Sequence, residues 1–381
     1  MNSDINDIRC EKDFKGMTFS GFKLTEVKNI LLNSLEGCKI EESCYWSAEL
    51  VCSGHIKYFI DIVIYYYAKF IHTANPKMAN YLDMRIHSII EIMISYASLE
   101  LSARNNKKMR KLVCEIVATL CNAKKRYIIA DVKIPISSYD LSAIRDKMKA
   151  PNVNYLQSVF DQEEDPKEIF IPINELCFQL SKDGGDTATA CYWVEWVIEW
   201  EKRCRKKHIK ISCCRRSWTS KLIQTQHQKD IIWVLWDCVL SEISTREVPL
   251  LTRICNSLLY LYSVRYSNSV YSKRKYLLYS AITLLHLPTT VLNEPLFTEP
   301  TKEIVEIVTN KIDEIYKQIK SNEQSPNTDY LFSGLNKRNN LEKSLKQIDL
   351  VNSLLSSSGP PIIENDDTEE CKDALEDDEN I

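Results

Sequence analysis

The chain has 381 residues, 44% of them hydrophobic, which is typical of a globular protein with one large core or two ordinary ones. Only 8 glycines and 12 prolines interrupt long periodic apolar runs, so the composition favours helices and leaves few Gly-rich loops of the kind that bind nucleotides. The formal net charge of −3 hides an asymmetry: residues 364–381 carry ten acids and one lysine, and the remainder has 48 Lys and Arg against 42 Asp and Glu. This distribution of charge is consistent with a mildly basic body that binds a polyanion. It is also consistent with a solvated body that carries a solubilising acidic tail.

Helical periodicity dominates the first third of the chain. The predicted helices there cover residues 23–35, 40–53, 55–72, 80–102 and 107–122. Gly37 and Gly54 follow the first two, as helix C-termini prefer, and Pro76 comes shortly after the third. We expect these helices to stack as α-hairpins. The short, β-branched run at residues 127–136 predicts an extended linker or an isolated strand.

The second half is also predicted to be helical. Its expected helices cover residues 140–149, 152–160, a segment starting at 166, 187–207, 227–244, 250–262, 272–285 and 301–320. Pro166 suits the first position of its helix. Beyond residue 321 the chain is rich in Asn and Ser, with one further helix expected at 341–355 before an acidic tail whose composition predicts disorder.

These elements predict an all-α fold made of two packed helical subdomains. The expected parts are an N-terminal subdomain at 17–126, a linker at 127–139, a C-terminal subdomain at 140–320, and a mostly disordered tail at 321–381. The runs Cys-Tyr-Trp at 44–46 and at 191–193 each open an aromatic helix after a Gly-containing turn. That similarity is consistent with a diverged duplication or with coincidence in a helix-rich sequence.

The cysteines and the longest apolar stretch bear on the compartment. The chain has 14 cysteines, but it is large and opens with a polar sequence rather than a signal peptide. Most of them lie in apolar helical patterns, where a reduced thiol packs as a small hydrophobe, so a reducing compartment is expected. Residues 58–71, interrupted by Asp61 and Lys69, are shorter than the roughly 20 residues that span a bilayer. We therefore expect neither a transmembrane segment nor a membrane partner.

The most informative feature is a basic stretch between tryptophans. Six of the seven tryptophans fall between Trp193 and Trp236, on either side of residues 202–221, which hold nine Lys or Arg. Five of them share helical spacing with apolar neighbours, which predicts core packing: Trp193, Trp196, Trp200, Trp233 and Trp236. Residues 202–221, the basic loop, are then expected to face solvent. The predicted binding residues are Lys206, Lys207, Lys210, Arg215, Arg216 and Trp218.

Other site chemistries find little support in the sequence. The chain contains no GxxxxGK[ST], GxGxxG, HExxH or GxSxG motif, so neither a catalytic residue nor a cofactor is assigned. Cys204, His208, Cys213 and Cys214 are weak candidates for zinc, because adjacent cysteines rarely bind one zinc ion together. An enzyme of unfamiliar type would need a polar cleft holding Glu195 or His55 with a second titratable partner.

Several separated blocks resemble a viral family. They are residues 20–57, 71–82, 165–181, 190–207 (ACYWVEWVIEWEKRCRKK) and 231–237 (IIWVLWD). In this order they resemble uncharacterised helical proteins encoded by large nucleocytoplasmic DNA viruses, over most of residues 17–285. The resemblance implies an all-helical viral protein in the host cytoplasm (the viral factory) or in the virion. That family has no assigned activity, so it implies no functional residues.

Three functions follow as hypotheses. The first is a non-enzymatic structural or interaction protein with a role in virion assembly or as a scaffold, contacting a protein partner. The second is a nucleic-acid-binding accessory factor of viral replication or transcription that uses the basic loop. The third is the enzyme of unfamiliar type, which the absence of a recognisable motif disfavours.

Overall fold

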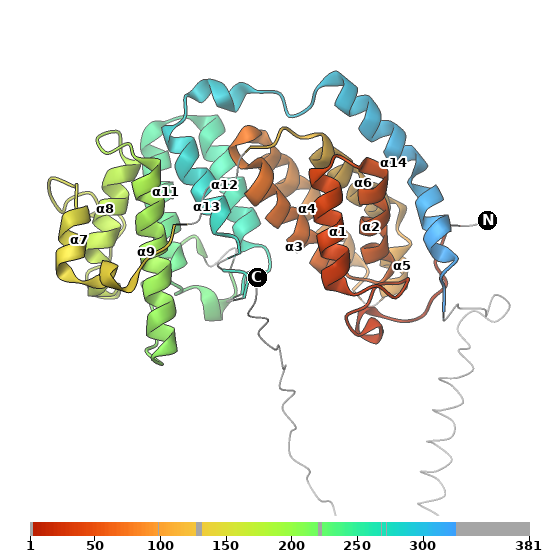
Figure 1. Ribbon diagram of the computed structural model, residues 1–381, viewed down its shortest axis with the longest axis horizontal. Helices are drawn as coiled ribbons and strands as arrows, with labels where there is room; N and C mark the ends of the chain where they lie inside the picture. Colours follow the sequence, from red (N-terminus) through yellow and green to blue (C-terminus); the bar gives the residue numbers. More distant parts are fainter. Residues whose placement is uncertain are drawn as a thin grey trace, which may run out of the picture. The chain divides into compact units, whose positions relative to one another are not determined.

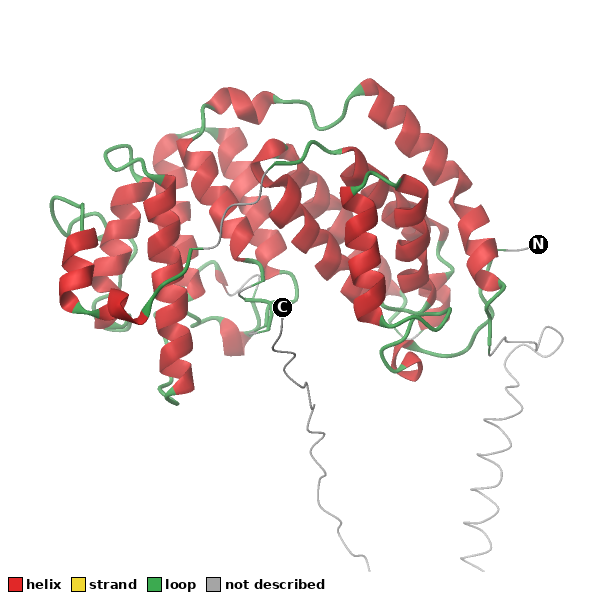
Figure 2. Cartoon of the chain, viewed as in Figure 1, coloured by secondary structure: helices red, strands yellow, loops and turns green. Residues whose placement is uncertain are grey.

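Every regular element of the described residues is a helix, because their apolar side chains recur at helical spacing (Figures 1 and 2). The computed structural model describes residues 3–97, 99–126, 132–219, 223–267, 269–271 and 273–324. The prediction of an all-α fold is confirmed. None of the helices in these residues is both long and apolar enough to cross a membrane. Residues 127–131 of the predicted linker, the predicted helix at 341–355 and the acidic tail lie outside the described residues.

The N-terminal helices lie where helices were predicted. They are α1 (Leu24–Glu36), α2 (Ile40–Cys52), α3 (Ile56–Tyr66), α4 (Lys77–Ser95), α5 (Glu100–Arg104) and α6 (Lys107–Asn122). Helices α1, α2 and α6 match the predicted limits to within one residue. Helix α2 packs against α1, α3 and α6. The Asn106 side chain caps α6 by accepting a hydrogen bond from the Met109 N–H at 2.9 Å. Local signals of this kind set the helix ends.

Two predicted helices in this half are shorter than expected. The helix predicted at 55–72 is α-helical only to Tyr66 and continues as a π-helical turn, Tyr67–Ile71, and a 3-10 turn, His72–Ala74. A proline ring makes the α conformation unfavourable for the residue that precedes it. Asn75, which precedes Pro76, accordingly has φ −143° and ψ 84°, outside the α region. The helix predicted at 80–102 is interrupted between α4 and α5.

The second half consists of hairpins followed by a long final helix. Its α-helices are α7 (Leu141–Lys147), α8 (Phe170–Leu180), α9 (Thr187–Lys206), α11 (Ile232–Arg246), α12 (Pro249–Ser263), α13 (Lys275–His286) and α14 (Glu299–Lys320). Short 3-10 turns in this half are Ile136–Tyr139, Lys167–Ile169, Thr225–His227 and Thr289–Asn293. A further 3-10 turn, Glu11–Phe14, precedes α1 in the first half. Helix α8 packs on α9 and α11, and α13 packs on α9 and α12.

The helix predicted at 152–160 is wrong, because this segment is a series of turns. The Asn152 side chain accepts a hydrogen bond from the Asn154 N–H at 3.0 Å, and the Asn154 side chain accepts one from the Gln157 side chain at 3.1 Å. Asparagine side chains that bond to nearby backbone compete with helix formation. Apolar spacing alone did not reveal this competition.

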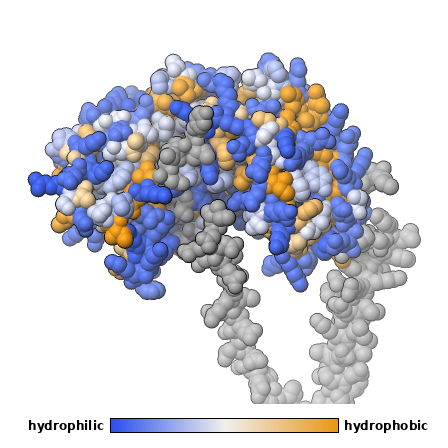
Figure 3. All heavy atoms as spheres, in the orientation of Figure 1, coloured by the Kyte–Doolittle hydropathy of each residue, from blue (hydrophilic) through white to orange (hydrophobic). Residues whose placement is uncertain are grey.

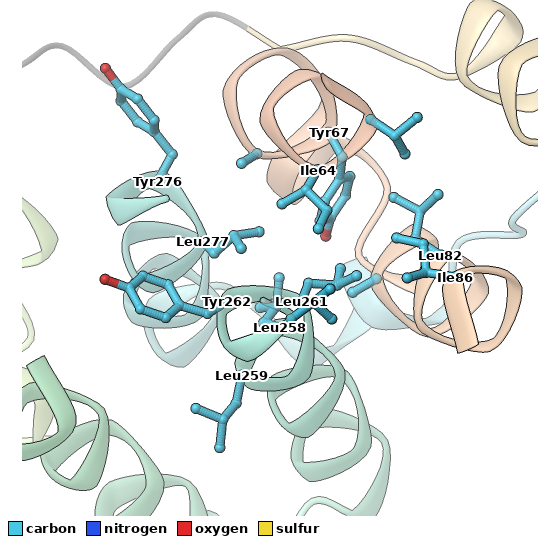
Figure 4. Close-up of a cluster of buried hydrophobic side chains, with 14 of the residues drawn as sticks. Ile64, Tyr67, Leu82, Ile86, Leu258, Leu259, Leu261, Tyr262, Tyr276 and Leu277 are labelled. Carbon is cyan, nitrogen blue, oxygen red and sulfur yellow. The ribbon is translucent and has the colours of Figure 1, made fainter. Parts of the chain in front are cut away.

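A continuous hydrophobic core runs through both halves. Helix α12 packs against α4, and their shared cluster includes Ile64, Leu82, Leu258 and Leu277 (Figure 4). Helix α14 packs on α2 and α6, although it is the last helix of the predicted C-terminal part. The subdomain boundaries and the duplication stay predictions.

Candidate interaction surface

The tryptophan stripe supports the basic loop from inside the core. Four of the five predicted core tryptophans are buried, namely Trp193, Trp196, Trp233 and Trp236, and Trp200 is half-buried against the same core. The Trp233 indole donates to the His227 carbonyl at 2.6 Å, which ties α11 to the preceding turn. The burial of these four side chains agrees with the prediction that the tryptophan stripe packs in the core.

Helix α9 carries the first part of the basic loop as its own last turn. The chain leaves α9 with His208 in the left-handed conformation (φ 59°). The Ile209 N–H donates to the Cys204 carbonyl at 2.9 Å, and the His208 N–H donates to the Arg205 carbonyl at 3.0 Å. This pair of bonds is a Schellman motif, which ends a helix and turns the chain sharply. The turn directs the following residues away from the axis of α9.

Besides Arg205, four cations are exposed at this end of α9 and in the segment that follows. They are Lys206, Lys207, Lys210 and Arg215, which we call the basic tip. The end of α9 projects beyond α8 in Figure 1, and the surface there is mostly hydrophilic (Figure 3). Ile209 lies among these cations with 51% of its surface exposed. Arg205 is also exposed, but its guanidinium is paired with the Glu201 carboxylate at 2.8 Å.

Arg216 is buried, which differs from the expectation that the whole basic loop faces solvent. Only 8% of the residue is exposed. Its guanidinium contacts the Asp165 carboxylate at 2.7 Å and donates to the Val159 carbonyl at 2.8 Å. Asp165 also accepts from the Cys214 N–H at 2.9 Å. A buried guanidinium needs such partners, so Arg216 anchors the loop rather than presenting charge.

Trp218 also differs from the expectation of an outward-facing side chain. It is half-buried, its indole N–H donates to the Asp237 carboxylate at 3.1 Å, and its ring meets Trp233 edge to face at 5.8 Å. It forms part of the wall of a groove between α11 and α12. A ring held in this way is poorly placed to stack on a nucleic-acid base.

A polar cluster of buried and half-buried side chains near the end of α9 was missed by sequence reasoning. His227 and Asp230 approach each other at 3.4 Å, and Glu201, Tyr266 and Tyr271 lie close to them. Burial raises the pKa of the Asp230 carboxyl. The tyrosines are dozens of residues from Glu201 in the chain, so no local pattern signals the cluster. Its position between the end of α9 and the start of α11 indicates a structural role in holding the tip.

The weak zinc candidates do not form a ligand set. In the part of the chain that the structure describes, no group of three or more His, Cys, Asp or Glu side chains is arranged to hold a metal ion. Cys213 is buried, whereas His208 is exposed at the turn after α9. The two side chains therefore lie in different surroundings, one in the interior and one in contact with solvent.

Glu195 and His55 each have a titratable partner, but both are inside the protein. Glu195 is 2% exposed, contacts the Lys275 ammonium at 2.8 Å and accepts a hydrogen bond from Tyr279. His55 is 4% exposed and lies 3.4 Å from the Glu11 carboxylate. Their burial leaves a substrate no direct access to either side chain.

Asp237, which joins Trp218 to Arg216, is expected to make stability depend on pH. Burial raises the pKa of its carboxyl, against a smaller lowering by the Trp218 hydrogen bond and Arg216. Between the pKa of an unfolded Asp, about 3.9, and the raised folded value, the native state binds more protons than the unfolded chain. The contribution of Asp237 to stability therefore falls as pH rises through this window.

Urea unfolding from pH 4 to 8 tests this dependence on Asp237→Asn, which keeps an acceptor for the Trp218 indole. The free energy of unfolding of the variant minus that of the parent should increase as the pH rises from 4. This difference should level off above the pKa of Asp237 in the folded protein. A difference that stays constant with pH contradicts the assignment.

The chain was compared with known proteins by sequence and by structure. No family model, curated protein or solved structure matches it.

Proposed function

We propose that this protein is a non-enzymatic, all-helical interaction protein that binds an acidic protein surface through the basic tip. The observation that carries the proposal is the exposure of Lys206, Lys207, Lys210 and Arg215 together, beside a tryptophan core that is packed and closed. Charges of one sign gathered on one surface attract a partner of the opposite sign and speed its association.

Both ends of the basic tip are fixed to the rest of the protein, which suits a surface that binds a partner better than one that only contacts solvent. The Schellman turn holds its start, and the Arg216–Asp165 ion pair at 2.7 Å holds the chain directly after Arg215. A segment held at both ends loses less conformational freedom when it meets a partner. The same four cations on an unanchored segment would bind more weakly.

The residues beside the cations favour a protein partner over nucleic acid. Ile209 is 51% exposed among them, and protein interfaces place apolar side chains inside a polar rim. Trp218, the aromatic residue that could have stacked on bases, is engaged by Asp237 and Trp233. Binding to nucleic acid is the second candidate, because the tip could still neutralise phosphates.

The viral role rests on the resemblance alone. If the chain is a relative of the helical proteins of large DNA viruses, the basic tip would serve as a contact in virion assembly or in a scaffold of the viral factory. Purification of the tagged protein from infected cells, with and without nuclease, separates direct protein partners from those tethered by nucleic acid.

Charge reversal of the basic tip tests the proposal directly. The variant Lys206→Glu/Lys207→Glu/Lys210→Glu/Arg215→Glu is expected to bind a fluorescent 20-residue poly-glutamate peptide at least about tenfold more weakly than the parent, as measured by fluorescence anisotropy. The side chains are exposed, so folding should be unaffected. Arg216 is left intact because it is buried.

A matched control reverses four exposed lysines elsewhere, Lys107, Lys108, Lys311 and Lys317. It changes the net charge equally and should bind the peptide nearly as well as the parent. Equal losses in both variants would show that only net charge matters and would refute the proposal. A duplex DNA probe tests the second candidate, for which affinity should fall linearly with salt on a log–log plot and be lost in the tip variant alone.

A further inference from the structure

A pair of buried thiols lies between two helices of the first half of the chain. Cys44 on α2 and Cys114 on α6 are both fully buried, and their Sγ atoms lie 3.6 Å apart. Both are free cysteines, 70 residues apart in the chain. Helices α2 and α6 pack against each other, and α14 packs on both of them (Figure 1). The sulfurs of a disulfide are about 2.05 Å apart, so an approach of about 1.5 Å would join the two helices covalently.

The two thiols differ in their acidity. The pKa of Cys114 is lowered, chiefly by its hydrogen bond with Cys44 and also by the Thr309 hydroxyl of α14, although burial opposes both. The same hydrogen bond, together with burial, raises the pKa of Cys44. The thiolate is the reactive form of a cysteine. Cys114 is therefore the nucleophile of the pair, and Cys44 is the thiol that donates to it.

An open hollow between α6 and α14 gives small molecules a route toward Cys114. Its volume is about 260 Å³, and its lining includes Thr309 and Glu115, the residue after Cys114. One water molecule takes up about 30 Å³ in the liquid, so the hollow has room for several molecules of that size. Thr309 connects the hollow, which it lines, with the thiol whose pKa it lowers. Hydrogen peroxide, a small hydrogen-bonding molecule, suits this route.

We propose that Cys114 and Cys44 form a redox site at which hydrogen peroxide oxidises the two thiols to a disulfide between α2 and α6. The site is separate from the basic tip, so it does not depend on the proposed function. In a reducing compartment, which the sequence predicts, structural disulfides are rare, whereas transient redox-sensing disulfides occur. The thiol pair therefore stays reduced until peroxide reaches it.

Each step of the oxidation balances. The Cys114 sulfur attacks one oxygen of hydrogen peroxide and breaks the O–O bond, which gives a sulfenic acid and a hydroxide that takes the Cys114 proton to become water. The Cys44 sulfur then attacks the Cys114 sulfur, and the sulfenic hydroxyl leaves with the Cys44 proton as a second water. The two sulfurs are oxidised and the peroxide is reduced by the same pair of electrons.

Peptide mapping of the full chain after treatment with hydrogen peroxide tests the proposal. Free thiols are blocked with iodoacetamide in urea, and the chain is cleaved after Lys and Glu without reduction. Cys44 then lies on residues 43–49 and Cys114 on residues 112–115, and neither peptide contains another cysteine. Mass spectrometry should find these two peptides linked, with two hydrogen atoms fewer than the separate peptides, and dithiothreitol should separate them.

Single variants test the assigned roles. In Cys44→Ala the sulfenic acid of Cys114 has no partner and should be captured by dimedone, whereas in Cys114→Ala dimedone should not label Cys44. Thr309→Val removes the hydroxyl and should slow disulfide formation at least about threefold, and Thr309→Ser keeps the hydroxyl and should keep the rate. Circular dichroism checks that each variant is folded. Labelling of Cys44 instead of Cys114 would contradict the assignment.

The disulfide should also stabilise the fold, because closing the loop from 44 to 114 restricts the unfolded chain. The midpoint of urea unfolding should rise on oxidation and fall back on reduction. The matched control, Cys52→Ala/Cys121→Ala, removes two other buried thiols of the same helices and should still form the link.

Two results overturn the proposal. One is oxidation of the exposed Cys38 without a link between Cys44 and Cys114. The other is an equally fast link between Cys177 and Cys238, which also interact, since this would show that any neighbouring thiols react alike.

Discussion

Replacing Asp165 with alanine is expected to lower the free energy of unfolding by about 3–5 kcal/mol. The carboxylate is buried, contacts the Arg216 guanidinium at 2.7 Å and accepts from the Cys214 and Asp161 N–H groups, each at 2.9 Å. Its removal leaves the Arg216 charge in the interior with a weaker partner, Asp237 at 3.6 Å, and frees the backbone on which the basic tip depends. Urea unfolding followed by circular dichroism measures the loss.

The neighbouring residue supplies the control for Asp165→Ala. Glu164 pairs with Lys229 at 3.1 Å, but both side chains are more than half exposed. Surface ion pairs contribute little, so Glu164→Ala should cost less than about 1 kcal/mol. The double variant Asp165→Leu/Arg216→Met should recover part of the loss, because it removes both buried charges. If Asp165→Ala and Glu164→Ala behave alike, the ion pair does not hold the loop.

The second large effect is expected from Trp236→Ala, at about 3–5 kcal/mol. Trp236 is fully buried on α11, and its ring meets Tyr262 of α12 at 5.5 Å. Truncation removes this contact and leaves a cavity that the packed helices fill only in part. Thermal and denaturant unfolding measure the change.

Trp200→Ala is the matched comparison for Trp236→Ala. Trp200 belongs to the same predicted stripe but is only half-buried at the end of α9, so a smaller loss is expected. Trp236→Phe should also cost less than Trp236→Ala, because it retains most of the ring volume. Equal losses for the two alanine variants would contradict the burial that distinguishes these residues.

Helix positions were predictable where the signals are local. The helices at α1, α2, α6 and α9 begin and end within one or two residues of the predicted limits. Apolar residues three and four apart determine their buried faces, and turns with Gly or Asn lie at their ends. The prediction of a helix at 152–160 was wrong for an equally local reason, because the asparagine side chains there bond to neighbouring groups and stabilise turns.

The candidate site was only half predictable. Sequence spacing separated the core tryptophans from the basic loop, but it treated all cations of the loop alike. Arg216 differs from Arg215 because Asp165, 51 residues earlier in the chain, is held opposite its guanidinium. Likewise, Trp218 is drawn inward by Asp237, a residue on the next helix. Such pairings depend on how distant elements pack, and one-dimensional patterns do not record them.

The sequence by itself determined the helical class, most helix limits and the burial of the tryptophan stripe, because each follows from periodicity and hydrophobicity along the chain. The tertiary structure decided which charged and aromatic side chains of the basic loop face solvent. It also brought the thiols of Cys44 and Cys114, from separate helices, to 3.6 Å from each other. The physical reason is that burial of a charge, or the close approach of two thiols, depends on partners brought together from separate parts of the chain.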